Sequence, residues 1–339
     1  MSVKEGQLLP PWKRSDTPGY AFGGNKFDLN QWDPAHFARL RDFVAEAGKR
    51  GIVVDLVLFS PLFSEHHWSL SPFNPGNNVS GIDPRVTRTD ILTLDRHGGL
   101  LQIQEALVRK IVTELRSFDN VIYELNHRRD LDNMTMEWEW HMLDVLDQAQ
   151  KAVGDRKLMA LNLGGNTRPD QEVDSRISVV NHLNASPAAV AAHATAKRAV
   201  GLVQVARELL SDPFARMRAW EFVLAGAGIY AHSDGSFRVS SPRGEAHAPA
   251  TALSGAGPIQ RRHLRLLAEF MGTIDYVHMR PVPELLAQPL PEGLQGQILA
   301  RPGESYVVYL RIPSPSLKQA QIRTPDGSVS FDRTILSSL

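Results

Sequence analysis

Cysteine is absent from the 339-residue chain. Its absence excludes disulfide bonds, thiolate metal sites and a cysteine nucleophile. An excess of charge is also missing, since Lys and Arg number 37 and Asp and Glu number 37, so nothing predicts binding to nucleic acid or to an acidic membrane surface. No apolar run reaches the roughly 20 residues that span a membrane, and the segment Met1–Gln7 lacks the apolar core of a signal peptide. We expect a soluble protein that is cytoplasmic as written, and secreted if an upstream segment is missing.

Strand and helix patterns alternate along most of the chain. Apolar, β-branched strand patterns fall at residues 52–59, 121–126, 157–163, 177–183, 200–205 and 227–232. Helical periodicity falls at about residues 33–51, 100–115, 135–152, 212–224 and 259–271. The first helix is marked by Asp33 as its N-cap and by Pro34 in its first turn. This alternation predicts an α/β fold with a parallel sheet, and the continuous apolar strands indicate that both faces of the sheet are buried.

Two of the predicted strands end in polar side chains just before a helical stretch. One lies in the segment Asn120–Arg129 (NVIYELNHRR) and the other in Lys197–Ala206 (KRAVGLVQVA). In a (β/α)8 barrel, the carboxyl ends of the strands form the face that carries the active site. The fold class that we expect is therefore a (β/α)8 TIM-type barrel.

The number of strands is too small for a complete barrel, because only six strand–helix units are recognisable. The first two strands are either absent or hidden in the irregular stretch 1–30. Such a barrel has two unpaired sheet edges, which natural proteins cover or close. Either residues 1–30 or a partner chain, as in a homo-oligomer, would cover them. From about residue 281, short alternating runs such as Ser305–Arg311 predict a small β-rich domain, so we expect domains at 1–280 and 281–339.

The two strand-end segments resemble those of the cellulase-type (β/α)8 glycoside hydrolases of bacteria, the retaining enzymes with two catalytic glutamates. The resemblance covers about residues 8–280. Its matching segments are 11–12, 15–20, 24–28, 77–78, 119–124 and 225–226. In that family Tyr-Glu is followed by two variable residues and then by Asn-Glu-Pro, and here His127, Arg128 and Arg129 hold those three positions. The family's nucleophile strand reads close to Gly-x-Asp-Glu-x-Gly, and Gln204 holds the nucleophile position.

The resemblance implies that both catalytic carboxyl groups are replaced. Glycoside hydrolysis needs one carboxyl group to protonate the leaving oxygen and a second to attack the sugar or activate water. Arg128 stays protonated because the pKa of a guanidinium exceeds about 12, so it does not donate a proton to a leaving group. The Gln204 amide neither forms a glycosyl ester at a useful rate nor carries a charge that would stabilise an oxocarbenium ion. We therefore expect hydrolysis by the family mechanism to be lost.

Other carboxyl groups near the strand ends are the alternative catalytic residues. Glu124 shares the strand face of Asn126 and Arg128, where it acts either as an acid or as the partner of Arg128 in a structural salt bridge. Asp130 and Asp234 follow predicted strands. Two of these carboxyl groups would have to lie about 5 to 10 Å apart to hydrolyse a glycoside.

Six polar or aromatic residues are candidates for substrate binding: Trp68, Asn126, His127, His182, His232 and Asp234. The three histidines fall at strand ends, where they form either a metal or acid/base cluster with Asp234 or, as we favour, ordinary polar lining, because none has the close spacing of metal ligands. Trp68 is either an apolar platform for a sugar ring or a packing anchor. No feature of the sequence calls for a cofactor.

Three functions remain open. The first is a carbohydrate-binding barrel, for a β-linked carbohydrate, that has lost hydrolysis. The second is a working glycoside hydrolase that uses relocated carboxylates. The third is a non-catalytic assembly protein that binds a partner through its exposed barrel edges. We favour the first, largely by analogy with the fold of the family that the chain resembles; a cleft without acids but with an intact aromatic and amide lining would support it.

Overall fold

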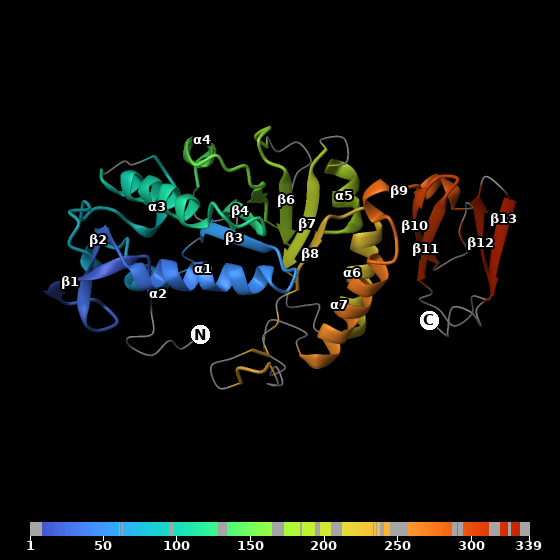
Figure 1. The fold of residues 1–339 in the computed structure, drawn as a ribbon, viewed down its shortest axis with the longest axis horizontal. Helices are drawn as coiled ribbons and strands as arrows, with labels where there is room; N and C mark the ends of the chain where they lie inside the picture. The colour runs from blue at the N-terminus through green and yellow to red at the C-terminus, as the bar shows by residue number, and fades with distance from the viewer. Residues whose placement is uncertain are drawn as a thin grey trace. The chain divides into compact units, whose positions relative to one another are not determined.

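The computed structural model describes residues 9–60, 62, 64–94, 98–127, 134–164, 173–183, 185–193, 197–204, 212–232, 234, 236–237, 241–244, 257–286, 290, 294–311, 319–324 and 327–332. Arg128, Arg129, Asp130 and the side chain of Gln204 lie outside the described part. The chain forms two compact units, Met1–Val180 and Asn181–Leu339 (Figure 1). The predicted domain boundary at 280/281 stays a prediction.

The first unit contains most of the predicted strand–helix alternation. Its elements are β1 (Trp12–Pro18), β2 (Asn25–Trp32), α1 (Pro34–Gly48), β3 (Val54–Phe59), α2 (Glu65–Leu70), α3 (Leu100–Leu115), β4 (Val121–Asn126), α4 (Met136–Ala152) and β5 (Met159–Asn162). The predicted N-cap of α1 is confirmed, because the Asp33 carboxylate accepts a hydrogen bond from the Ala35 amide at 2.9 Å.

The second unit continues the alternation and ends in small antiparallel sheets. Its helices are α5 (Pro187–His193), α6 (Asp212–Leu224) and α7 (Pro258–Met271). Its strands are β7 (Ala199–Gln204), β8 (Ile229–Tyr230), β9 (Arg280–Pro281), β10 (Gln295–Arg301), β11 (Ser305–Arg311), β12 (Gln319–Thr324) and β13 (Gly327–Asp332), and β6 (Val179–Leu183) spans the unit boundary. The strand predicted at 305–311 is confirmed as β11, which pairs antiparallel with β10.

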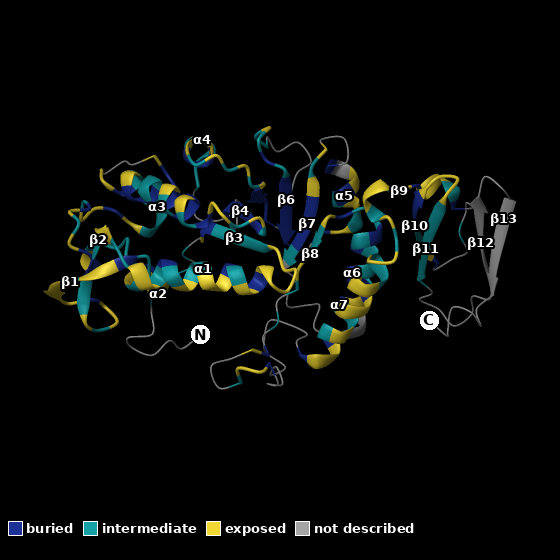
Figure 2. Ribbon diagram, viewed as in Figure 1, coloured by how far each residue is buried: buried dark blue, intermediate teal, exposed yellow. Residues whose placement is uncertain are grey.

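The six predicted strands form one sheet in the order β3-β4-β5-β6-β7-β8. The pairs β3–β4, β4–β5 and β7–β8 are parallel. Every residue of β4 and of β6 is buried (Figure 2). Burial of both strand faces explains why these segments read as continuous apolar runs rather than as alternating ones.

The described part of the stretch that we predicted to be irregular is a β-hairpin. β1 and β2 pair antiparallel and form a two-stranded sheet of their own, so in residues 9–32 they add no strand to the parallel sheet. Phe27 and Leu29 point inward from β2 and are buried. The Arg14 guanidinium lies 3.8 Å from the centre of the Phe27 ring. The spacing of Phe27 and Leu29 at period two was the sequence signal for this hairpin.

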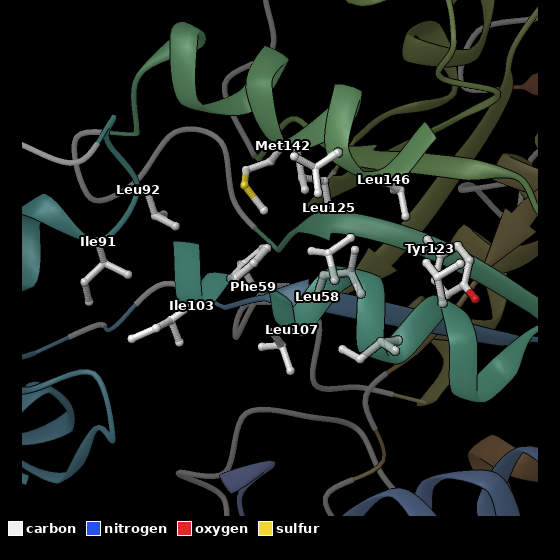
Figure 3. Packing of buried hydrophobic residues seen from close by; sticks show 14 of the residues in the cluster. Leu58, Phe59, Ile91, Leu92, Ile103, Leu107, Tyr123, Leu125, Met142 and Leu146 are labelled. Carbon is white, nitrogen blue, oxygen red and sulfur yellow. The ribbon is translucent and has the colours of Figure 1, made fainter. Parts of the chain in front are cut away.

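The core of the first unit lies between the sheet and helices α3 and α4 (Figure 3). The helices contribute Ile103, Leu107, Met142 and Leu146, and the strand β4 contributes Tyr123 and Leu125. Each fully buried aliphatic or aromatic side chain stabilises the fold by about 1.5–3 kcal/mol. Trp138 of α4 is fully buried, and its indole nitrogen donates to the Gln104 side-chain oxygen at 3.0 Å.

The second unit has its own apolar contacts. Trp220 of α6 lies 5.1 Å from the Phe270 ring and 6.4 Å from the Tyr309 ring, measured between ring centres. The Tyr276 hydroxyl donates to the carbonyl oxygens of Val223 and Ala227, at 2.9 and 2.7 Å. The ring contacts give Trp220 a packing role within this unit. In the described residues, no helix is both long enough and apolar enough to cross a membrane.

We expect Trp138→Ala to lower the free energy of unfolding by about 3–5 kcal/mol, because it leaves a cavity and removes the partner of a buried amide. Trp140→Ala is the matched control, since Trp140 lies on the same helix and is 38% exposed. Urea unfolding followed by circular dichroism measures both changes. Equal losses in the two variants would contradict the assignment of Trp138 to the core.

Candidate functional site

The carboxyl end of β4 carries three of the predicted site residues. Glu124 and Asn126 point to one face of the strand, and Tyr123 and Leu125 point to the other face, into the helix-covered core. Glu124 is 1% exposed, and its carboxylate lies 3.5 Å from Nδ1 of His127. His127 follows the strand and donates its backbone amide to the Phe59 carbonyl at 3.2 Å. The predicted partner of Glu124, Arg128, lies outside the described residues.

Asn126 is fully buried at the end of β4. Its Nδ2 lies 3.2 Å from the sulfur of Met134. Its Oδ1 is buried and accepts no hydrogen bond from the residues that the structure describes. Since a buried acceptor without a partner costs about 1–3 kcal/mol, this oxygen is ready to accept a hydrogen bond from a water or ligand hydroxyl.

Asn162 is a second buried amide at this edge, and our sequence analysis missed it. β4 and β5 pair in parallel at Tyr123–Met159 and Glu124–Ala160, and both strands end two residues further on, at Asn126 and Asn162. Asn162 Oδ1 accepts from the Gly164 amide at 3.0 Å, whereas its Nδ2 is buried and has no hydrogen-bond partner in the described part of the chain. The signal in the sequence was a polar residue at the end of an apolar strand, with Gly164 and Gly165 shortly after it. Together the two amides present one unused acceptor and one unused donor.

The end of β6 carries Asn181 and His182 in the second unit. Both are buried, at 0% and 1% exposure. A Cβ atom on Gly201 would lie 2.0 Å from Oδ1 of Asn181, so glycine is required there to admit the amide. The ring of His182 lies 5.2 Å from that of His193, between ring centres, and neither nitrogen of His182 has a hydrogen-bond partner.

The environment of His182 favours the neutral imidazole. Burial, and to a smaller extent the neighbouring His193, lower the pKa of His182 to about 4. Burial and then the charge of Arg198 also lower the pKa of His193. Neutral imidazoles donate and accept one hydrogen bond each, so His182 offers both functions at neutral pH.

The remaining predicted residues of the second unit follow β7 and β8. β7 ends at Gln204, one residue before the predicted strand end at residue 205, and His232 lies half-buried beyond β8. Asp234 accepts hydrogen bonds from Arg261 at 2.6 Å and from the hydroxyl and amide of Ser236 at 2.5 and 2.9 Å. Burial alone would raise the pKa of Asp234, but these hydrogen bonds and the Arg261 charge lower it overall. This carboxylate is therefore held in its ionised form.

Trp68 lies in the short helix α2 of the first unit. It is 9% exposed and belongs to the main hydrophobic cluster of that unit. This placement favours the packing anchor over the sugar platform. Within the described ranges, no three His, Asp or Glu side chains lie close enough together to hold a metal ion.

Comparison with solved structures identifies proteins with a similar fold. A glycoside hydrolase family 5 protein from Bacteroides vulgatus superposes with a TM-score of 0.54 at 12% identity, over 85% of this chain and 63% of that structure. Two structures of an endo-β-1,4-mannanase from Thermotoga petrophila also superpose. One has a TM-score of 0.51 at 12% identity, over 74% of this chain and 82% of that structure. The other has a TM-score of 0.50 at 10% identity, over 87% of this chain and 81% of that structure. The fold is that of the cellulase-type glycoside hydrolases.

The predicted (β/α)8 fold class and the family resemblance in fold are thereby confirmed. No protein-family profile matches the sequence, and no curated protein matches it either. The chain spans 63% of the length of the Bacteroides protein. At 10–12% identity the similarity is in fold alone, and it does not establish the activity or the substrate of this protein.

We expect acid to destabilise the fold through His182. Because its folded pKa of about 4 lies below the ordinary value of 6.5, the unfolded chain binds the proton more readily. Stability is therefore full above about pH 6.5 and is lost as pH falls toward about 4, by about 3 kcal/mol. Urea unfolding between about pH 7 and about pH 4 measures this loss.

The variant His182→Gln removes the titrating group, so its unfolding free energy should depend less on pH than that of the unchanged protein. His66→Gln is the control, because His66 is exposed on α2. Parallel pH profiles for His182→Gln and the unchanged protein would contradict the assignment of this loss to His182.

Proposed function

We propose that this protein binds a β-linked carbohydrate with a glycoside hydrolase fold and does not hydrolyse it by the two-glutamate mechanism. The observation that carries the proposal is the pair of buried strand-end amides, Asn126 and Asn162. One offers an unused acceptor and the other an unused donor. A sugar hydroxyl both donates and accepts hydrogen bonds, so a sugar with two hydroxyls in reach would satisfy both amides.

The position of the amides agrees with the fold. In (β/α)8 enzymes the carboxyl ends of the strands form the ligand-binding face, and both amides end their strands. His127, next to Asn126, is 28% exposed on its side chain, so it is the residue of this group that a ligand reaches first. Because endo-β-1,4-mannanases share the fold, β-1,4-linked oligosaccharides are the first ligands to test.

Loss of hydrolysis is supported by the residues that hold the family's catalytic positions. Arg128 and Gln204 replace the two glutamates in the sequence, and neither side chain performs the chemistry of a carboxyl group. Two of the three alternative acids already have a partner in the described residues. Glu124 lies buried beside His127, and Asp234 is ion-paired with Arg261. A general acid must be protonated at the working pH, and the arginine opposes protonation of Asp234.

Binding is tested by calorimetric titration with manno- and cello-oligosaccharides. We expect saturable binding, and we expect Asn126→Leu and His127→Ala each to weaken it about tenfold, as the loss of a ligand hydrogen bond predicts. His66→Ala is the control, since this exposed histidine lies on α2 and is not among the strand-end residues. Thermal melting checks that the variants are folded. No binding to any β-linked oligosaccharide would overturn the proposal.

Hydrolysis is tested with aryl β-glycosides and the same oligosaccharides, comparing the unchanged protein with the double variant Arg128→Glu/Gln204→Glu. We expect no turnover by the unchanged protein and measurable turnover by the double variant, because the variant restores both carboxyl groups. Release of reducing sugar is the readout. Turnover by the unchanged protein would refute the loss of hydrolysis, and Glu124→Gln, Asp130→Asn and Asp234→Asn would then identify the acids in use.

A further inference from the structure

A cavity opens at the opposite ends of the same strands. It has a volume of about 550 Å³ and is formed by the segments that lead into β3, β4 and β5. Its lining comprises Val53, residues 116–119 with Val121 and Ile122, and residues 155–158. Pockets for small molecules usually measure about 300–1,000 Å³, so this cavity has the size of a ligand site. The amides of the proposed carbohydrate site lie at the carboxyl ends of β4 and β5, away from it.

The walls of the cavity are tied together by hydrogen bonds. The Lys157 ammonium is 4% exposed, pairs with the Asp155 carboxylate, and donates to the Arg116 carbonyl at 3.5 Å. It therefore joins the segment before β5 to the segment before β4. The Asn120 amide group donates to the Ile52 carbonyl at 3.0 Å and so joins the segment before β3 as well. Because the walls are already ordered, a ligand loses little binding free energy to ordering them.

The floor of the cavity is apolar and partly open to water. Val53 is 59% exposed and Leu158 is 49% exposed. Ile122, in contrast, is buried. Apolar side chains in a concave site gain about 25 cal/mol for each Å² of apolar surface that a ligand covers. The floor thus favours a ligand with an apolar body.

Two cations in the lining, Arg116 and Arg156, have no carboxylate partner among the residues that the structure describes. Arg116 and Arg156 are exposed. The Arg116 guanidinium donates to the Thr113 carbonyl within its own helix turn, at 3.3 Å, and among the described residues neither Arg116 nor Arg156 forms an ion pair. Lys157 already neutralises Asp155. The other acid of the lining, Asp119, is exposed and would repel an ion with several negative charges.

We infer that this cavity binds a small amphipathic monocarboxylate, with its hydrocarbon part on Val53 and Leu158 and its carboxylate on Arg116 and Arg156. Arginine suits this role because its planar guanidinium binds a carboxylate through two parallel hydrogen bonds. The single negative charge is compatible with Asp119, whereas phosphate and nucleotides are disfavoured. This site is independent of the proposed carbohydrate binding, so the failure of one proposal would not refute the other.

The test uses octanoate as the probe, with octanamide as its neutral counterpart and inorganic phosphate as the multiply charged ion. Calorimetry and amide NMR spectra of the full chain measure binding. We expect saturable binding of octanoate with shifts at residues 116–119 and 155–158, and weaker binding of both comparison compounds. No saturable binding of octanoate, or equal binding of octanamide, would overturn the inference.

Variants then locate the site. We expect octanoate binding to weaken by about tenfold or more in the double variant Arg116→Gln/Arg156→Gln, which loses the contacts to the carboxylate. We expect a similar loss in Leu158→Ser, which loses an apolar contact to the hydrocarbon part. Arg109→Gln is the matched control, since Arg109 is an exposed arginine of α3 that pairs with Glu105 and does not line the cavity. Unchanged affinity in the double arginine variant or in Leu158→Ser, or an equal loss in Arg109→Gln, would refute the assignment. All the substituted residues are at least partly exposed, and thermal melting confirms that the variants are folded.

Discussion

Alternate residues of a parallel strand point to opposite faces, and the rest of this structure depends on how β4 uses the two faces. Tyr123 and Leu125 enter the core beneath α3 and α4. Glu124 and Asn126 are thereby directed to the other face, where both are also buried. A shift of the strand by one residue would place a carboxylate among aliphatic side chains and expel two core residues, so the register is strongly fixed. Packing of Tyr123 and Leu125 in the core thus determines that Glu124 and Asn126 lie together on the other face of β4.

The same strands support different chemistry at their two ends. At the carboxyl ends, the paired strands β4 and β5 each end in a buried amide, and the unused hydrogen-bonding groups of these amides are neutral. At the amino ends, helices have just finished and loops supply cations, as Arg116 does directly after α3. A neutral array that both donates and accepts suits a sugar, whereas a pair of arginines above apolar side chains suits an amphipathic anion. Because the strands run in the same direction, the two proposed sites lie at opposite ends of the same strands.

The parts of the fold that follow from local pattern could be predicted from the sequence. The bounds of β4, α3 and α6 agree with those predicted, because a continuous β-branched run and a long helical period are strong signals. The hairpin β1–β2 was missed, since its inward positions are few and its remaining residues are polar. The short helix α5 was missed as well, because seven residues form a helix through packing rather than through propensity. Asn162 escaped notice for a further reason: its importance depends on the register with β4, which one strand alone does not reveal.

Binding and catalysis depend on this fold in different ways, which is why one can persist without the other. Two-glutamate hydrolysis needs two particular carboxyl groups at a fixed separation, so replacement of either removes the reaction. In the proposed carbohydrate site, binding would instead be distributed over several neutral donors and acceptors at the strand ends. Asn126 and Asn162 each hold a buried polar atom without a hydrogen-bond partner among the described residues, at a cost of about 1–3 kcal/mol each. At the proposed site a bound hydroxyl would recover that free energy, so amides that weaken the empty fold would strengthen a complex, whether or not residues 128 and 204 are carboxylic acids.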